Sequence, residues 1–152
     1  MKRAHYIFCL FLLAITFVTN GYSIFESNGK VGLKNEDGKV LIPAKYEALG
    51  WSDAEFSVLS NTTGYRSNGK WGLISLSNQI ITKAEFESIV PSDASFVIVR
   101  KKSSLSFRMV SGVVTTSGKE VIPAIYDGIK IHSLRAIVFS KIGDQYKYGL
   151  LD

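Results

Sequence analysis

A short motif recurs along this chain at a nearly fixed spacing, and this repetition constrains the fold more than any other feature. Each copy contains one glycine in an apolar segment: Gly32, Gly72, Gly112 and Gly149. The first three copies also contain an aromatic residue at one fixed place: Tyr46, Phe86 and Tyr126. The spacing is 40 residues between the first three glycines and 37 before the last. A period of this size is typical of repeat proteins, in which each unit covers a hydrophobic face of its neighbour. We delimit the copies as residues 28–67, 68–107, 108–145 and a partial copy, 146–152.

The first half of each copy predicts a hairpin. The glycine lies in a short apolar strand, where it indicates a bulge or the close approach of another backbone. A turn follows, in which positions 38, 78 and 118 hold Gly, Asn and Gly. Since these residues tolerate positive φ, we predict a tight turn with φ > 0 at Asn78.

The second half of each copy predicts two more elements. Pro43 and Pro123 interrupt the second strand, and Lys83 takes their place in the middle copy, where we place the second strand at 79–82. Because proline lacks a backbone donor, we expect a bulge, bend or strand end there. We predict third strands at 55–59, 95–99 and 135–139, followed by polar hairpins, the first of them at 61–64.

These segments predict an all-β fold. No helical period follows the N-terminal segment. We expect an antiparallel meander with about three strands per repeat of about 40 residues, arranged as an open, twisted array. A partial, propeller-like packing is the alternative, although a closed propeller needs about four or more full blades. We expect the partial fourth copy, 147–151, to pair with residues 136–140.

The N-terminal segment is predicted to be a secretory signal peptide, residues 1–23. Its start is basic, residues 6–18 form an uncharged apolar run, and small or polar residues follow. The run is shorter than the roughly 20 apolar residues of a membrane-spanning helix. We expect cleavage after Ser23, or after Gly21 as the alternative. Residues 24–152 then form a single exported domain with no stable membrane span.

Composition argues against several kinds of site. The single cysteine, Cys9, lies within the apolar run, so the mature chain would have no disulfide and no thiolate metal site. His132 has no second metal ligand or nucleophile partner in the sequence. The net charge of +5 is spread along the chain and falls when Lys2 and Arg3 leave, which does not favour nucleic acid as a partner. We expect no catalytic residue, cofactor or metal.

The repeat resembles the WG repeat of bacterial proteins. The residues that carry the resemblance are 70–73 (KWGL), 41–47 (LIPAKYE) and 118–127 (GKEVIPAIYD), and the pattern covers 28–152. Only Trp71 is the expected tryptophan, since Val31, Ser111 and Tyr148 occupy the equivalent places. The resemblance implies a repeat architecture and brings no catalytic or cofactor residue with it.

The repeated positions are interpreted as structural residues. They are Gly32, Gly72, Gly112, Gly149, Pro43, Pro123, Trp71, Tyr46, Phe86 and Tyr126. We favour core packing over a ligand platform for Trp71, because a tryptophan dominates a small core. An acidic residue also recurs, as Glu47, Glu87 and Asp127, and we favour a solvated or locally hydrogen-bonded role for it over a cation site.

The sequence thus favours a secreted or envelope-associated, non-catalytic module for binding or scaffolding. Its partner would be a protein or glycan of the cell envelope or exterior, and Trp51, Tyr65 and Tyr146 are candidates to line the exposed binding face. The alternative is an accessory domain or fragment of a larger enzyme or surface protein.

Overall fold

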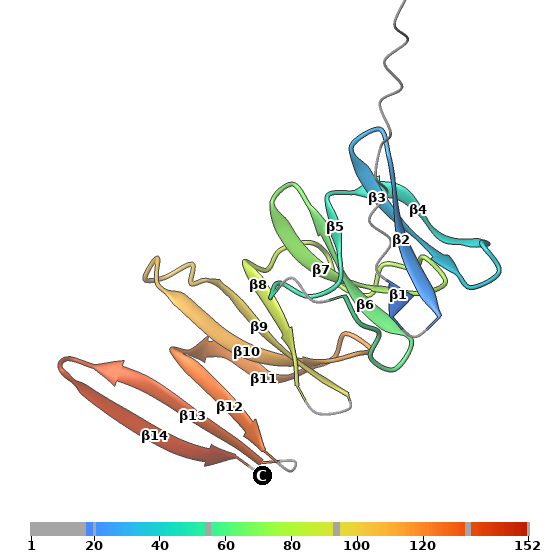
Figure 1. The fold of residues 1–152 in the computed structure, drawn as a ribbon. Helices are drawn as coiled ribbons and strands as arrows, with labels where there is room; N and C mark the ends of the chain where they lie inside the picture. The colour runs from blue at the N-terminus through green and yellow to red at the C-terminus, as the bar shows by residue number, and fades with distance from the viewer. Residues whose placement is uncertain (1–17, 20, 54–55, 93–94, 133–134, 152) are drawn as a thin grey trace, which may run out of the picture.

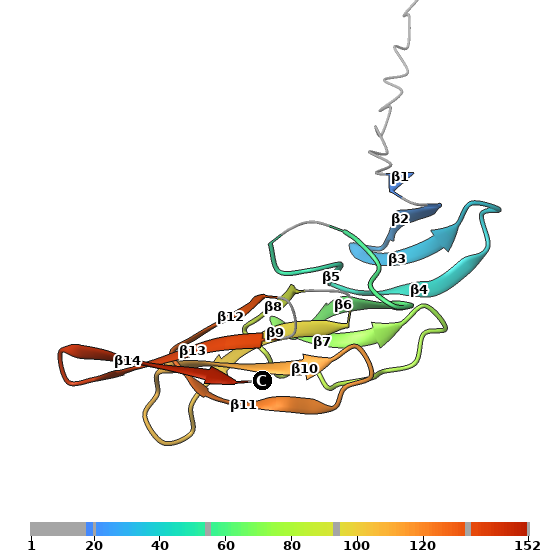
Figure 2. The same cartoon turned by 90° about the horizontal axis from the view of Figure 1, so that it is seen from below.

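The protein is built of small antiparallel sheets. The computed structural model describes residues 18–19, 21–53, 56–92, 95–132 and 135–151. Within these ranges the regular secondary structure consists of β-strands alone. In each sheet, strands that lie side by side are also consecutive along the chain. The four sheets, named A to D along the chain, stack from one end of the molecule to the other (Figures 1 and 2), and none closes or curls. The predicted open, all-β meander is confirmed.

The sheet boundaries fall inside the sequence repeats. Sheet A contains β1 (Val18–Thr19), β2 (Tyr22–Ser27), β3 (Lys30–Asn35) and β4 (Val40–Tyr46). Sheet B contains β5 (Ala48–Leu49), β6 (Thr62–Ser67) and β7 (Lys70–Ser75). Sheet C contains β8 (Ser88–Pro91), β9 (Phe96–Lys102), β10 (Met109–Thr115) and β11 (Glu120–Tyr126). Sheet D contains β12 (Gly128–His132), β13 (Arg135–Ile142) and β14 (Gln145–Leu151). Sheet C therefore combines the last two strands of one copy with the first two strands of the next.

Each interface between neighbouring sheets holds one hydrophobic cluster. The cluster between A and B contains Leu33, Ile42, Tyr46, Leu49, Tyr65, Ile74 and Leu76. The cluster between B and C contains Trp51, Leu73, Phe86, Ile89, Val97, Val99 and Val114. The cluster between C and D contains Val113, Ile129, Ala136 and Val138, with Phe96, Ile98 and others packed against it. Stability is thus shared among three thin cores, as repeat arrays require.

The two faces of a middle strand serve different clusters. In β9, Val97 and Val99 join the cluster with sheet B, whereas Phe96 and Ile98 pack against the cluster with sheet D. Successive side chains of a strand point to opposite faces, so a strand between two sheets must be apolar on both. This explains the unbroken apolar run in this part of the chain.

The third strand of the first copy is not where the sequence placed it. Residues 56–58 form no strand, residue 55 lies outside the described residues, and the strand is β6. Ser60 and Asn61 both have positive φ and form the two-residue turn of a narrow hairpin closed by Leu59 and Thr62. The expected hairpin at 61–64 is therefore wrong as well. A longer connection in this copy shifts the strand out of the 40-residue register.

The second strand of the second copy is also weaker than predicted. Residues 79–82 form no regular strand, although isolated bridges at Ile74–Ile80 and Trp71–Phe86 and several backbone hydrogen bonds hold residues 79–86 beside β7. The Thr82 hydroxyl accepts the Leu73 N–H at 2.9 Å, a bond that a ladder would give to a backbone carbonyl. This side-chain bond competes with regular pairing.

Two local predictions are confirmed. Asn78 has a φ of 61°, and the glycines at positions 38 and 118 have 77° and 86°. In the last copy, β14 pairs with β13 through Ala136–Leu151 and Ser140–Lys147, as expected. The predicted signal peptide lies largely outside the described residues and stays a prediction. Cleavage after Gly21 would leave β2 whole, whereas cleavage after Ser23 would remove its first two residues.

Candidate binding surface

The strand glycines mark places where another backbone passes very close. A Cβ on Gly32 would lie 2.6 Å from the Ile42 carbonyl oxygen and 2.7 Å from the Ala44 nitrogen. A Cβ on Gly112 would meet Ala124 and Ile122 at the same range, 2.7–2.8 Å. These distances are far inside van der Waals contact, so only glycine fits.

The backbone that passes close to Gly32 and Gly112 belongs to a β-bulge, which the next strand forms around its proline. Between β3 and β4, Leu33 pairs with Ile42 and Val31 pairs with Tyr46. An advance of two residues along β3 therefore lies opposite an advance of four residues along β4. The β10–β11 pair repeats this register at Ile122 and Tyr126. Pro43 and Pro123 lie exposed in the two bulges, where their missing N–H is not needed.

Gly149 occupies the same place in the last copy, but its neighbour is different. Among the described residues, the only atom within 4 Å of a Cβ built there is Val138 Cγ2, at 3.2 Å. No strand follows β14 among the described residues, and none of their backbone crosses this glycine. The notch is therefore present and unfilled.

The repeated aromatic residues belong to the sheet interfaces. Tyr46 and Phe86 are buried, and Tyr126 is half-buried against the cluster between C and D. The Tyr46 and Tyr65 rings lie 4.9 Å apart, and the Tyr65 hydroxyl donates to the Thr82 carbonyl at 3.2 Å. Burial raises the pKa of Tyr65, with the neighbouring Tyr46 as a second cause. These contacts match a structural role.

The two tryptophans differ in burial. Trp71 is half-buried and packs against the cluster between B and C, whereas Trp51 is only 1% exposed and lies within it. The Trp51 Nε1–H donates to Ser57 Oγ at 2.8 Å. The expectation that Trp51 and Tyr65 line an exposed face is wrong, because a sheet packs over both. Tyr146 is exposed as expected.

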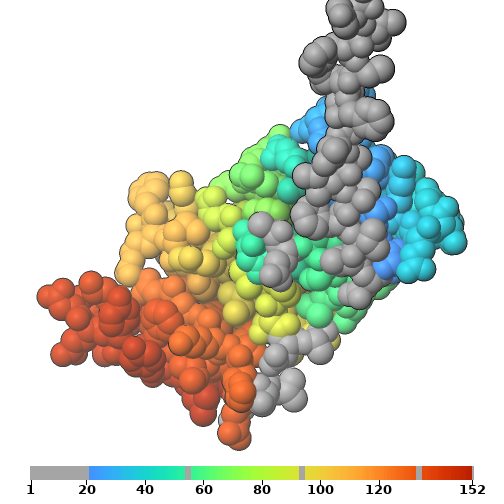
Figure 3. Space-filling view, viewed as in Figure 1, coloured from blue at the N-terminus to red at the C-terminus, as the bar shows by residue number. Residues whose placement is uncertain are grey.

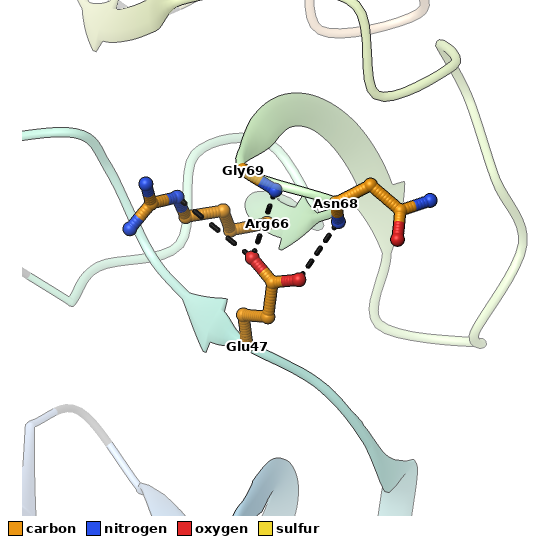
Figure 4. A network of polar contacts seen from close by, with 4 residues as sticks. All are labelled: Glu47, Arg66, Asn68 and Gly69. Atoms are coloured by element: carbon orange, nitrogen blue, oxygen red, sulfur yellow. Dashed lines mark hydrogen bonds and ion pairs between the residues drawn. The ribbon is translucent and has the colours of Figure 1, made fainter.

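The recurring acidic residues lie where the chain passes from one sheet to the next, and they accept hydrogen bonds there. Figure 4 shows Glu47, which accepts the backbone N–H of Asn68 at 2.8 Å and of Gly69 at 3.0 Å. Arg66 lies 4.0 Å away. The Gly69 bond is the largest cause that lowers the pKa of Glu47.

The other two acidic residues are held in a related way. Glu87 pairs with Lys70, whose hydrogen bond lowers the pKa of Glu87. Asp127 accepts from Arg108 at 2.7 Å and from the Lys141 N–H at 2.5 Å. All three carboxylates are occupied by protein donors, which supports the hydrogen-bonded role over a cation site.

The residues beside each glycine always face the following sheet. Val31 and Leu33 contact the first cluster, Trp71 and Leu73 the second, and Val113 the third. Tyr148 and Leu150 are the equivalent pair in β14, but no described sheet follows, and they are 71% and 61% exposed.

These two residues belong to a larger apolar face of sheet D. Ala136 and Val138 point toward sheet C, so the alternate residues of β13 point away from it. We define the outer face of sheet D by Ile137, Phe139, Tyr146, Tyr148 and Leu150. The Phe139 ring lies 6.0 Å from both tyrosine rings, at interplanar angles of 72° and 42°. Sheet D forms one end of the molecule, as Figure 3 shows.

The WG containing repeat matches this chain over residues 32–53, 71–103 and 112–131. The chain belongs to the WG-repeat family. Neither a curated protein nor a solved structure matches it. The three matched segments start at or next to the strand glycines, so the WG repeat begins where the bulged backbone crosses. The Trp-Gly pair itself is intact only at Trp71-Gly72.

A hollow of about 440 Å³ opens between sheets C and D, lined mainly by apolar side chains such as Phe96, Ile122 and Leu151. In the described ranges, no three His, Cys, Asp or Glu side chains gather to hold a metal ion. His132 is exposed at the end of β12. No helix in the described part of the chain is long and apolar enough to span a membrane.

Proposed function

We propose that this WG-repeat protein is an exported, non-catalytic binding module whose partner docks on the outer face of sheet D. The observation that carries the proposal is the exposure of Tyr148 and Leu150, whose equivalents in the other copies pack against a neighbouring sheet. An apolar face of this kind on a soluble domain marks an interaction site.

The chemistry of the face favours a protein partner over a glycan. The Phe139 ring is inclined to the two tyrosine rings by 72° and 42°, so the three rings form no single flat platform for a sugar ring. Aliphatic side chains border them, and tyrosine and phenylalanine beside leucine and isoleucine are typical of protein interfaces. The partner is a protein of the envelope or exterior that presents an apolar surface.

A docking experiment tests this proposal. Isolated envelope proteins, peptidoglycan fragments and glycans are screened against the purified mature protein by surface plasmon resonance. A protein hit should bind at least about tenfold more weakly to the variant Tyr148→Ser/Leu150→Ser, since central aromatic contacts dominate interfaces.

The matched control is Val40→Ser/Ile80→Ser, which removes two exposed apolar residues, 47% and 50% exposed, from β4 and from the segment beside β7. This control should bind as the parent does. Equal losses in both variants, or a glycan as the only ligand, contradict the proposed surface.

Export is tested separately. The full chain is expressed in a Gram-negative host, and the N-terminus of the exported product is determined by mass spectrometry. We expect Tyr22 or Ile24 as the first residue, in accord with the basic start and the apolar run. An intact Met1 in a protein retained inside the cell contradicts export.

A further inference from the structure

The outer edge of β14 differs from that of its equivalents. In sheets A and C, the glycine strand is the third of four and a bulged strand pairs along its far side, β4 or β11. In sheet D, β14 pairs with β13 only, and every residue from 145 to 150 is exposed. The backbone groups along this edge have no described strand beside them, and such an edge is a template for pairing.

Gly149 makes this edge selective for a strand with a bulged backbone. At Gly32, Gly72 and Gly112 the missing Cβ admits the backbone of the crossing segment, which comes within 2.6–2.8 Å of the place a Cβ would occupy. At Gly149 the only described atom within 4 Å of that place is Val138 Cγ2. The strand thus keeps the notch that a bulged backbone needs.

We propose that β14 accepts, in trans, a bulged strand from a partner polypeptide, with the pattern aliphatic–Ile–Pro–Ala–any–aromatic. By the register of β3 with β4, the isoleucine would lie opposite Leu150 and the aromatic residue opposite Tyr148. The strand would run antiparallel to β14, as in known strand additions. The inference rests on the proposed function insofar as sheet D is the binding end.

The occupant follows from contacts already present in the molecule. The β4 and β11 segments, LIPAKY and VIPAIY, fill the same notch in sheets A and C. Both are already paired in their own sheets, and the described residues hold no further copy of this pattern, so we take the occupant to be a segment of another polypeptide. Its isoleucine and aromatic side chains would extend the outer face of sheet D, since Ile42 and Tyr46 face the following sheet.

A peptide titration tests the proposal. A synthetic peptide with the sequence of residues 118–127 (GKEVIPAIYD) is added to the ¹⁵N-labelled protein, and amide exchange is followed by NMR. We expect saturable binding, with the amides of Tyr148 and Leu150 exchanging at least about tenfold more slowly at saturation. A control peptide with the changes Ile122→Ser and Tyr126→Ser lacks the two side chains that would lie opposite Leu150 and Tyr148, and it should bind at least about tenfold more weakly.

The variant Gly149→Ala tests the notch directly. Its methyl group would meet only Val138 Cγ2 at 3.2 Å in the free protein, so the fold should persist. The same methyl would clash with a bulged strand, so we expect affinity for the peptide to fall at least about tenfold. Should this variant fail to fold, the two peptides still decide the matter on the parent protein.

Three results would overturn the inference: no protection of β14, equal binding of both peptides, or equal binding by a folded Gly149→Ala variant. These results are distinct from a failure of the proposed function. If the peptide does not bind but Tyr148→Ser/Leu150→Ser still weakens the protein partner, only the strand-acceptor proposal fails. If the peptide binds but that variant leaves partner docking unchanged, only the docking face is wrong.

Discussion

At the scale of single residues, the repeated positions have three distinct roles. The glycines provide space for a crossing backbone, and the acidic residues hold the connections between sheets. The aromatic residues fill the interfaces. The largest fully buried side chain, however, is Trp51, which lies outside the repeated pattern.

Replacement of Trp51 should be the more damaging of the two tryptophan changes. Trp51→Ala removes a fully buried side chain and its bond to Ser57, so we expect the free energy of unfolding to fall by about 3–5 kcal/mol. Trp71→Ala should cost clearly less, because Trp71 is only partly buried. Urea unfolding followed by circular dichroism measures both. A larger loss at Trp71 would show that the family tryptophan is the main core residue.

Acid should weaken the Glu47 connection. The pKa of Glu47 is lowered in the folded protein, chiefly by the Gly69 N–H bond, so its stabilisation is present above the unfolded pKa, about 4.5. It is lost as the pH falls through the folded pKa. Thermal unfolding between pH 7 and pH 3 should therefore show a smaller acid-induced decrease in melting temperature for Glu47→Gln than for the parent. The control is Glu120→Gln, which replaces an exposed residue of β11 and should leave the acid-induced decrease in melting temperature as in the parent.

At the scale of the elements, the repeated unit is a glycine strand joined to a bulged proline strand. This pairing occurs in sheets A and C with the same register shift, and β7 of sheet B keeps it as isolated bridges and backbone hydrogen bonds without a regular strand. Lys83 stands there in place of proline, and the Thr82 side chain replaces part of the ladder. Sheet D has the glycine strand alone among its described strands.

The pairing predicts that the same substitution, glycine to alanine, lowers stability at Gly112 and leaves it nearly unchanged at Gly149. Gly112→Ala places a Cβ 2.7 Å from the Ala124 backbone, which the paired strand holds in place, so we expect a loss of about 1–3 kcal/mol or more. Gly149→Ala should change stability by no more than about 0.5 kcal/mol, as surface changes do. Urea unfolding of both variants provides the comparison. Equal losses would mean that the bulge does not decide the need for glycine.

At the scale of the whole molecule, stability depends on how many neighbours a sheet has. Sheets B and C are covered on both faces by clusters, whereas sheet D has one cluster on one face. Repeat arrays behave approximately as a sum of units and nearest-neighbour interfaces. The end of such an array opens before its middle.

Hydrogen exchange should reveal this gradient. The amides of β9 and β10 lie in the middle of the stack and should exchange at least about tenfold more slowly than the outward amides of β14. NMR exchange measurements at neutral pH provide the rates residue by residue. Uniform protection across the four sheets would instead indicate a single cooperative core.

The sequence by itself determined the local geometry. Positive φ at position 78, the bulges at Pro43 and Pro123 and the all-β class follow from what glycine, asparagine and proline permit at their own backbone. The pairing of β14 with β13 also followed, because a short hairpin leaves two adjacent strands few alternatives.

Only the tertiary structure decided which strands share a sheet and which faces remain open. The long connection before β6 moved a strand away from residues 55–59, and it buried Trp51, which the sequence had placed on the surface. The exposed face of sheet D and the open notch at Gly149 also became visible only there. Turns are set by neighbouring residues, whereas burial depends on which distant segment packs over a side chain, and a repeat period does not specify that.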